Sequence, residues 1–216
     1  TATDTFTVVV ANTNDAPTLA NAILDGSTAE DSSYSLDVSA MCADVDVGDT
    51  ISHSLTGAPS TLSVASGTIS GTPVNADVGT HTITVTCTDV AGASVSDTYV
   101  LTVTNVNDAP TFSSTAVTAA TEDAAYSYTA TASDVDVGDT VTLTGTTIPT
   151  WMSFDATTGA LTGTPTNSEV GSHAVTITAT DAAGATATDT FTVVVANTND
   201  APTVSTGLVD ASVDED

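Results

Sequence analysis

Apolar residues alternate with Thr, Ser or Asp along several stretches of this chain, a period of two that is typical of half-buried β-strands. In the first half, the apolar positions of two such stretches are Tyr34, Leu36, Val38, Ala40 and Cys42, and then Ile83, Val85 and Cys87. The second half repeats the pattern at Tyr126, Tyr128, Ala130 and Ala132, and then at Val175, Ile177 and Ala179. No window of a dozen residues carries the stripe of an amphipathic helix. The pattern predicts an all-β protein built from antiparallel β-sandwiches with Greek-key connections, with about seven strands each.

The two halves are tandem copies of one module. The segment Asn-Asp-Ala-Pro begins at Asn14, Asn107 and Asn199, so the copies are spaced by 107 − 14 = 93 and 199 − 107 = 92 residues. Residues 1–18 are identical to residues 186–203. We therefore expect residues 1–17 to be the last strand and linker of a preceding module and residues 201–216 to start a following one. Modules 1 and 2 are expected at residues 18–108 and 109–200.

Charge narrows the range of functions. The chain has 27 Asp and Glu residues and no Lys or Arg, which gives a formal charge of −27. Nucleic-acid binding is excluded in practice, because neutralising phosphates requires Lys or Arg. A phosphate-binding loop with its lysine and a lysine-built isopeptide crosslink are excluded outright. Hydrophobic residues make up 40% of the chain and alternate regularly, which favours a folded polyanion over disorder. No apolar run is long enough to span a membrane.

The acidic residues recur at fixed places in each module. After the second predicted strand come Asp44, Asp46 and Asp49 in module 1 and Asp134, Asp136 and Asp139 in module 2. Asp89 and Asp181 follow the sixth strand, and Glu30-Asp31, Glu122-Asp123 and Glu215-Asp216 form a third set. The loops after strands two and six of a sandwich lie at the same pole, so the carboxylates should repel by about 1 kcal/mol or more per pair. Oxygen ligands with no Cys or His among them predict Ca²⁺ as the neutralising cation.

These motifs resemble those of the cadherin-like superfamily. The resemblance is strongest to the dystroglycan-type cadherin and immunoglobulin-like tandem repeats of bacterial surface proteins, and it covers nearly the whole chain. It rests on Asn105-Val106-Asn107-Asp108-Ala109-Pro110, on Asp134-Val135-Asp136, on Thr180-Asp181-Ala182-Ala183-Gly184, and on the segment from Trp151 to Pro165. Asn105 stands where the cadherin linker has its first Asp, and Gly-Thr-Pro replaces the Asp-Arg-Glu motif. These departures imply fewer ions per junction than in classical cadherins.

The resemblance implies that calcium is bound at each module junction. At the middle junction the implied ligands are Glu30, Asn105, Asn107, Asp108, Asp134, Asp136, Asp139 and Asp181. At the first junction they are Asn14, Asp15, Asp44, Asp46, Asp49 and Asp89, and at the third they are Glu122, Asn199 and Asp200. Only the middle junction is complete in this sequence. The alternative is that these residues merely form Asx turns and keep the surface soluble.

The two cysteines, Cys42 and Cys87, lie at core-facing positions of module 1, where module 2 has Ala132 and Ala179. Immunoglobulin domains carry an inter-sheet disulfide between strands that face each other in this way. We expect a disulfide, which suits an exported protein. Two buried free thiols are the alternative.

Other residues give weaker signals. His81 and His173 are equivalent and are expected to be exposed at a strand start, while His53 has no counterpart. Asp97 and Asp189 recur before a Thr-aromatic pair, and the sequence suggests for them only an edge bulge.

The favoured interpretation is a non-catalytic, calcium-rigidified segment of an extracellular or cell-surface stalk, adhesin or fibre, with neighbouring modules of the same or like chains as partners. Asp pairs that recur in every module indicate repeated architecture and not an active site. Two alternatives stay open. One is an adhesion module that binds carbohydrate or a cell-surface ligand, and the other is a filament subunit whose terminal segments pair with other chains by strand addition.

Overall fold

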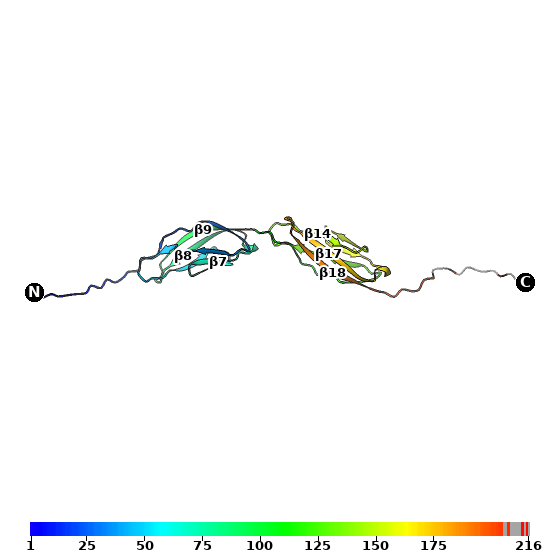
Figure 1. Ribbon diagram of the computed structural model, residues 1–216, viewed down its shortest axis with the longest axis horizontal. Coiled ribbons are helices and arrows are strands. Elements are labelled where there is room, and N and C mark those ends of the chain that lie inside the picture. Colours follow the sequence, from blue (N-terminus) through cyan, green and yellow to red (C-terminus); the bar gives the residue numbers. More distant parts are fainter. Residues whose placement is uncertain (205–206, 208–212, 214, 216) are drawn as a thin grey trace. The chain divides into compact units, whose positions relative to one another are not determined.

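The computed structural model describes residues 1–204, 207, 213 and 215, and its ribbon is drawn in Figure 1. The chain divides into unit 1, Thr1–Asn107, and unit 2, Asp108–Asp216. Each unit has nine strands and one short 3-10 helix within the described residues. The prediction of an all-β protein made of two repeated sandwiches is therefore confirmed. The expected start of a following module, residues 201–216, falls largely outside the described residues.

Unit 1 contains β1 (Thr18–Leu19), β2 (Gly26–Ala29), β3 (Tyr34–Asp37), β4 (Cys42–Ala43), β5 (Ser52–Thr56), β6 (Leu62–Ala65), β7 (Thr68–Gly71), η1 (Asn75–Asp77), β8 (Gly79–Thr88) and β9 (Ser94–Thr104). Its larger sheet has the strand order β2-β9-β8-β5, and its smaller sheet has the order β3-β7-β6. Strands β1 and β4 form a separate short pair. Residues 1–17 form no strand, and their assignment to a preceding module stays a prediction.

Unit 2 contains β10 (Thr111–Phe112), β11 (Ala119–Thr121), β12 (Tyr126–Thr129), β13 (Ala132–Ser133), β14 (Thr142–Thr147), β15 (Met152–Asp155), β16 (Ala160–Gly163), η2 (Asn167–Glu169), β17 (Gly171–Thr180) and β18 (Thr186–Ala196). The sheet orders β11-β18-β17-β14 and β12-β16-β15 repeat those of unit 1 strand for strand. The short pair β10–β13 corresponds to β1–β4.

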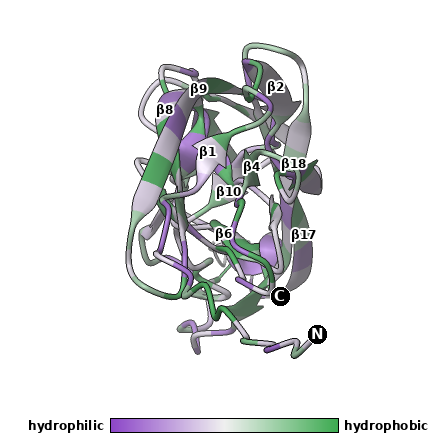
Figure 2. Cartoon of the chain, turned by 90° about the vertical axis from the view of Figure 1, so that its left-hand side faces the viewer, coloured by the Kyte–Doolittle hydropathy of each residue, from purple (hydrophilic) through white to green (hydrophobic). Residues whose placement is uncertain are grey.

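The alternation places one face of each long strand in the core. Along β8 the side chains of Ile83, Val85 and Cys87 are fully buried, and the Thr residues between them are only half-buried. Figure 2 shows this as a change of hydropathy from residue to residue along β8. In unit 2, Val175 and Ile177 of β17 are fully buried in the same way. Burial of these strands between two sheets supplies the hydrophobic stabilisation of each unit.

Two details of the strands differ from the prediction. The stretch from Tyr34 to Cys42 is not one strand, because a turn closed by a hydrogen bond from Met41 N–H to Val38 O at 3.0 Å separates β3 from β4. The sandwiches are also not wholly antiparallel, since β2 pairs in parallel with β9 and β11 with β18. Alternation reports which face a residue occupies and carries no information on strand direction.

A disulfide joins Cys42 of β4 to Cys87 of β8, and the two Cα atoms lie 6.5 Å apart. It crosses unit 1 at the place that Ala132 and Ala179 occupy in unit 2. The pairing agrees with the expectation from the sequence, and the alternative of two free thiols is not seen.

Candidate metal centres at the poles of each unit

Each sandwich has two acidic ends. We call the end at which the chain comes into a unit its N-pole, made of residues 12–15, 44–49 and 89 in unit 1 and residues 108, 134–139 and 181 in unit 2. The opposite end is the C-pole, made of residues 30–31 and 104–107 in unit 1 and residues 122–123, 167 and 196–200 in unit 2. All of the predicted ligands belong to one of these four poles.

At the N-pole of unit 1, the linker is tied to the acidic loops by hydrogen bonds. Asn14 Nδ2 donates to Asp89 Oδ2 at 2.9 Å, and Asp15 N–H donates to Asp46 Oδ2 at 2.8 Å. Carboxylate oxygens of Asp44, Asp49 and Asp89 lie within 4.8 Å of one another. Asp44 Oδ2 is buried and has no hydrogen-bond partner. The structure thus gathers all six ligands that were predicted for the first junction into one pole.

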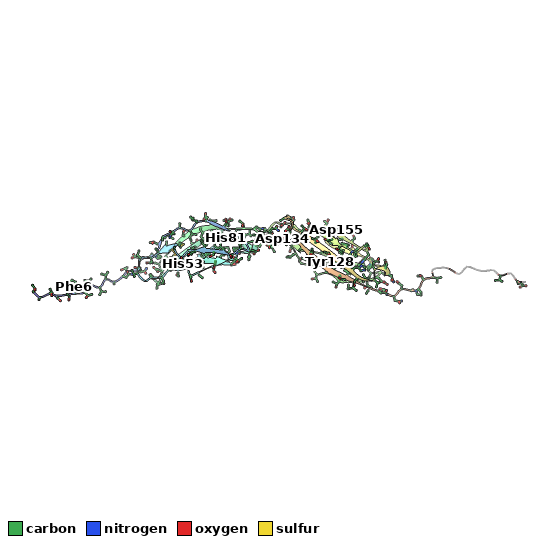
Figure 3. All side chains as sticks on the ribbon, viewed as in Figure 1. Phe6, His53, His81, Tyr128, Asp134 and Asp155 are labelled. Carbon is green, nitrogen blue, oxygen red and sulfur yellow. A yellow bond between two sulfur atoms is a disulfide. The ribbon has the colours of Figure 1, made fainter. Side chains whose placement is uncertain are left out.

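The N-pole of unit 2 has the same construction. Asp108 N–H donates to Asp136 Oδ2 at 2.9 Å, as Asp15 does to Asp46. Carboxylate oxygens of Asp134, Asp136 and Asp139 lie within 4.8 Å of one another, and Asp134 Oδ2 is buried without a hydrogen-bond partner. Figure 3 labels Asp134 at this end of the unit. Asp181 is 6% exposed and accepts a hydrogen bond from Ala185 N–H at 2.7 Å, which fixes its own loop.

The Asp-Val-Asp-Val-Gly-Asp sequence explains why the acidic loops fold in this way. Asp134 Oδ1 accepts a hydrogen bond from Asp136 N–H at 2.9 Å, an Asx turn that also occurs between Asp44 and Asp46. Gly138 then adopts a φ of 91°, a left-handed conformation that favours glycine. The turn leaves Asp134 with one oxygen occupied by the loop and the other available for a ligand.

The C-pole of unit 2 contains the most isolated carboxylate. Glu122 is 2% exposed, and neither Oε1 nor Oε2 has a hydrogen-bond partner. Its oxygens lie within 4.8 Å of carboxylate oxygens of Asp123 and Asp200. Asp200 is held by Asn167 Nδ2, which donates to its Oδ2 at 3.0 Å. Burying a carboxylate without a compensating partner costs several kcal/mol, so this pole fits a bound cation.

The C-pole of unit 1 contains Glu30, which is fully buried. Its Oε1 accepts a hydrogen bond from Val106 N–H at 2.9 Å, while Oε2 is buried with no hydrogen-bond partner. Asp31 follows with a φ of 57°, as Asp123 follows Glu122 with a φ of 60°. The Glu-Asp pair is thus a turn that directs the Glu inward in both units.

The asparagines of the linkers lie at the surface, and some polar residues at the poles were not predicted. Asn105 is exposed in the linker, and Asn199 Nδ2 donates to Asp200 O. Sequence reasoning missed Asn12, whose Nδ2 donates to Asp46 Oδ1 at 2.8 Å, and also Asn167. Asn12 occupies the linker position of Asn105, so the repeat itself carried the signal for it.

The two remaining motifs have structural roles. His81 and His173 are half-buried and not exposed as expected, because each ring Nε2 bonds the carbonyl of the residue four positions earlier, Asp77 or Glu169. Asp97 Oδ2 accepts from Ile23 N–H at 2.7 Å, and Asp189 Oδ2 accepts from Tyr128 OH at 3.1 Å. The expected edge bulge is wrong, since β8 pairs with β9 and β17 pairs with β18 in an unbroken register.

The fold and the poles define a class of tandem immunoglobulin-like sandwiches with acidic ends. The chain belongs to the family described as "Putative Ig domain", whose model matches residues 16–104 and 109–196, once in each unit. The predicted resemblance to immunoglobulin-like repeats of bacterial surface proteins is confirmed by this match and by the relatives described next.

Relatives include the "Serine-rich adhesin for platelets" of two Staphylococcus aureus strains, MRSA252 and MSSA476. Each is 35% identical over 159 residues, which is 73% of this chain. The chain spans 11% and 7% of the length of these two relatives.

Among solved structures, mouse cadherin-23 EC22-24 is 22% identical with a TM-score of 0.47. The match spans 85% of this chain and 65% of the cadherin-23 chain. The endo-fucoidan hydrolase MfFcnA4 is 25% identical with a TM-score of 0.41. The match spans 85% of this chain and 29% of the hydrolase chain. Neither helix of the described residues approaches the length and apolarity needed to cross a membrane.

Proposed function

We propose that the poles bind Ca²⁺ and that the bound ions stiffen a non-catalytic, extracellular array of sandwich modules. The observation that carries the proposal is Glu122, a buried carboxylate with two unpartnered oxygens beside Asp123 and Asp200. The chain has no Lys or Arg side chain that could neutralise this group. The donors are carboxylate and amide oxygens, which suit a hard cation such as Ca²⁺.

A complete junction combines the C-pole of one unit with the N-pole of the next. Glu30 holds the N–H of Val106, and Asp136 holds the N–H of Asp108. Only Asn107 lies between these two residues, so their amides are two chain steps apart, a span of at most about 7 Å. Chain connectivity therefore favours a shared site in which Glu30 and Asp136 act with Asn107, Asp108, Asp134, Asp139 and Asp181. Asn105 is the least supported ligand of the set.

The bound ion would supply charge neutralisation and rigidity, not chemistry. Calcium at such extracellular sites binds with dissociation constants of about 10⁻⁴ to 10⁻³ M. Membership of the immunoglobulin-like family and adhesin relatives support a cell-surface role in which the modules provide length. Ligand recognition by such a stalk, including recognition of carbohydrate, stays a prediction.

Calorimetric titration of the full chain with CaCl₂ tests the proposal. Glu122→Gln and Asp134→Asn should each lower the number of ions bound or weaken binding at least tenfold. Asp155→Asn is the matched control, because Asp155 carries the same charge in unit 2 but caps a turn through Thr157 N–H at 2.8 Å. Figure 3 labels Asp155 and Asp134, the two residues compared. No heat of binding, or equal losses in the control, would contradict the proposal.

Strand addition is a second candidate, favoured by one observation. Residues 1–11 have the sequence of β18, in which Val193 and Val195 are buried. In residues 1–11 the equivalent Val8 and Val10 are 70% and 87% exposed. This segment could act as the last strand of a sandwich that lacks its own.

A mixing experiment tests strand addition. The full chain should co-elute with a shortened chain that ends at residue 185 and therefore lacks β18. Val8→Asp should abolish co-elution, whereas Val9→Asp should not, because its counterpart Val194 is 51% exposed in β18. Absence of any complex would rule the second candidate out.

A further inference from the structure

The disulfide of unit 1 lies directly behind the N-pole of that unit. Cys42 and Cys87 each stand two residues before a predicted calcium ligand, Asp44 and Asp89 respectively. Asp44 is the first residue after β4, and Asp89 is the first residue after β8. Carboxylate oxygens of these two residues lie within 4.8 Å of one another and of an oxygen of Asp49. The disulfide therefore joins the two strands that carry these carboxylates to the pole.

The two strands differ in how firmly hydrogen bonds hold them. β8 pairs with β9 along its whole length and also with β5, in the middle of the larger sheet. β4 has two residues, and within the part of the chain that the structure describes it pairs with β1 in a separate two-stranded sheet. A ribbon of two such short strands is marginally stable on its own. The disulfide thus links a weakly held strand covalently to a central one.

A long hydrogen bond connects the two acidic loops of this pole. Val90 N–H, in the loop after β8, donates to Asp49 Oδ1, in the loop after β4, at 3.4 Å. The matching hydrogen bond of unit 2, from Ala182 N–H to Asp139 Oδ1, measures 3.1 Å. Because a hydrogen bond of 3.4 Å is weak, it restrains the two loops of unit 1 only slightly. The disulfide restrains the strands from which these loops begin.

Unit 1 also has a longer connection into β4. Residues 39–41 separate Val38 from Cys42, whereas Thr131 alone separates Ala130 from Ala132 in unit 2. A longer connection leaves more conformational freedom to the strand that follows it. The insertion and the disulfide occur together in unit 1, and unit 2 has neither. The disulfide therefore restrains a strand that the insertion would leave less constrained.

We propose that the disulfide positions Asp44 against Asp89, so that the cation site of this pole is formed before the cation binds. This inference rests on the proposed function of the poles. Carboxylates at this separation repel one another when no cation neutralises them, and the disulfide keeps the two loops from moving apart. A preformed site binds more tightly, because binding does not have to supply the ordering of the loops. The N-pole of unit 2 has Ala132 and Ala179 in place of the cysteines and lacks this restraint.

The test replaces Cys42 and Cys87 together by Ala and follows calcium binding at each N-pole separately. The reporters are the amide resonances of Asp46 and Asp136, whose N–H groups bond the first Asp of their own loops at 2.9 Å. In an NMR titration of the full chain with CaCl₂, the midpoint for Asp46 should rise about tenfold in the double variant, as is typical when the support behind metal ligands is removed. The midpoint for Asp136 should not change.

A matched control separates positioning of the ligands from stability of the unit. Ile83 is fully buried in the middle of β8, opposite Tyr99 and outside the acidic loops. Ile83→Ala should therefore destabilise unit 1 and leave the Asp46 midpoint unchanged. All variants are compared at a temperature at which their spectra show unit 1 folded. The fold accommodates Ala at both cysteine positions, because unit 2 has Ala at both.

Hydrogen exchange of the unaltered chain in calcium-free buffer gives a readout that needs neither calcium nor a variant. Ala20 N–H donates to Met41 O at 2.8 Å, next to the β1–β4 pair, and Ser113 N–H donates to Thr131 O at 2.9 Å at the same place in unit 2. Relative to their intrinsic rates, the Ala20 amide should exchange more slowly than the Ser113 amide, because the disulfide holds β4 in place. This difference should disappear in the double variant.

Two results would overturn this inference and leave the proposed function intact. One is an Asp46 midpoint that is equal in the unaltered chain and the double variant, or that rises as much in Ile83→Ala. The other is equal exchange of the Ala20 and Ser113 amides in the unaltered chain, which decides the question even if the double variant does not fold. If no amide of the unaltered chain responds to CaCl₂, the proposed function itself fails, and this inference fails with it.

Discussion

Asn14 Nδ2 donates a hydrogen bond to Asp89 Oδ2 at 2.9 Å, which joins the segment before β1 to the loop that follows β8. The pKa of the Asp89 carboxyl lies below its ordinary value, and this hydrogen bond is the largest cause of that shift. An amide of the linker thus lowers the pKa of an acidic residue 75 positions away in sequence.

The first prediction concerns this pair in calcium-free buffer. Asn14→Ala should raise the pKa of Asp89 towards its ordinary value, because the largest stabilising interaction of the carboxylate is lost. A depressed pKa in the folded state contributes stability above the unfolded value of about 3.9, and this contribution disappears as the pH falls through the folded value. Acid unfolding of unit 1 should therefore begin at a higher pH in Asn14→Ala.

NMR titration of the Asp89 carboxyl measures the shift directly. Asn21→Ala is the matched control, since Asn21 Nδ2 donates to the backbone carbonyl of Ala40 at 2.7 Å and not to a carboxylate. An Asp89 pKa that stays depressed in Asn14→Ala would contradict this assignment.

The second prediction concerns the disulfide, which closes a loop with a sequence separation of 45 residues. Replacing both Cys42 and Cys87 by Ala, the residue found in unit 2, should lower the free energy of unfolding of unit 1 by about 3 to 4 kcal/mol. Unit 2 should be unaffected. The single Trp of the chain, Trp151, lies in unit 2, so its fluorescence follows unit 2 alone while circular dichroism follows both units. If the unfolding transition seen by Trp151 fluorescence shifted as much as the one seen by circular dichroism, the loss of stability would not be confined to unit 1, contrary to this prediction.

The third prediction concerns Tyr128, whose hydroxyl donates to Asp189 Oδ2 at 3.1 Å and pairs with Ser114 Oγ at 2.8 Å. Burial raises the pKa of this tyrosine above its ordinary value. Tyr128→Phe leaves Asp189 without this donor and should destabilise unit 2 by about 1 to 2 kcal/mol. Denaturant unfolding followed by Trp151 fluorescence measures the change. Ser127→Ala, an exposed change on the same strand, should alter stability by less than about 0.5 kcal/mol.

The sequence predicted those parts of the molecule that repeat. Alternation located the core strands, and the recurrence of Asp44 and Asp134 located the acidic loops, because both signals are local and occur twice. The pairing of Cys42 with Cys87 followed from their shared phase in the alternation and from the equivalence with Ala132 and Ala179.

What the sequence could not predict depends on contacts between distant residues. The parallel pairing of β2 with β9 leaves no trace in a period of two. Asp97 and Asp189 occupy equivalent positions, yet one accepts from a backbone amide and the other from a tyrosine hydroxyl, because unit 1 has Leu36 where unit 2 has Tyr128.

The central claim is that calcium at the junctions stiffens the array. In small-angle X-ray scattering of the full chain, calcium should give a single extended form, and chelation should give a broader ensemble, because Glu30, Asp134 and Asp136 then repel one another and bending separates them. Asp134→Asn combined with Asp136→Asn should give the broad ensemble even with calcium present, and Asp155→Asn should not. Identical scattering curves with and without chelator would contradict the claim.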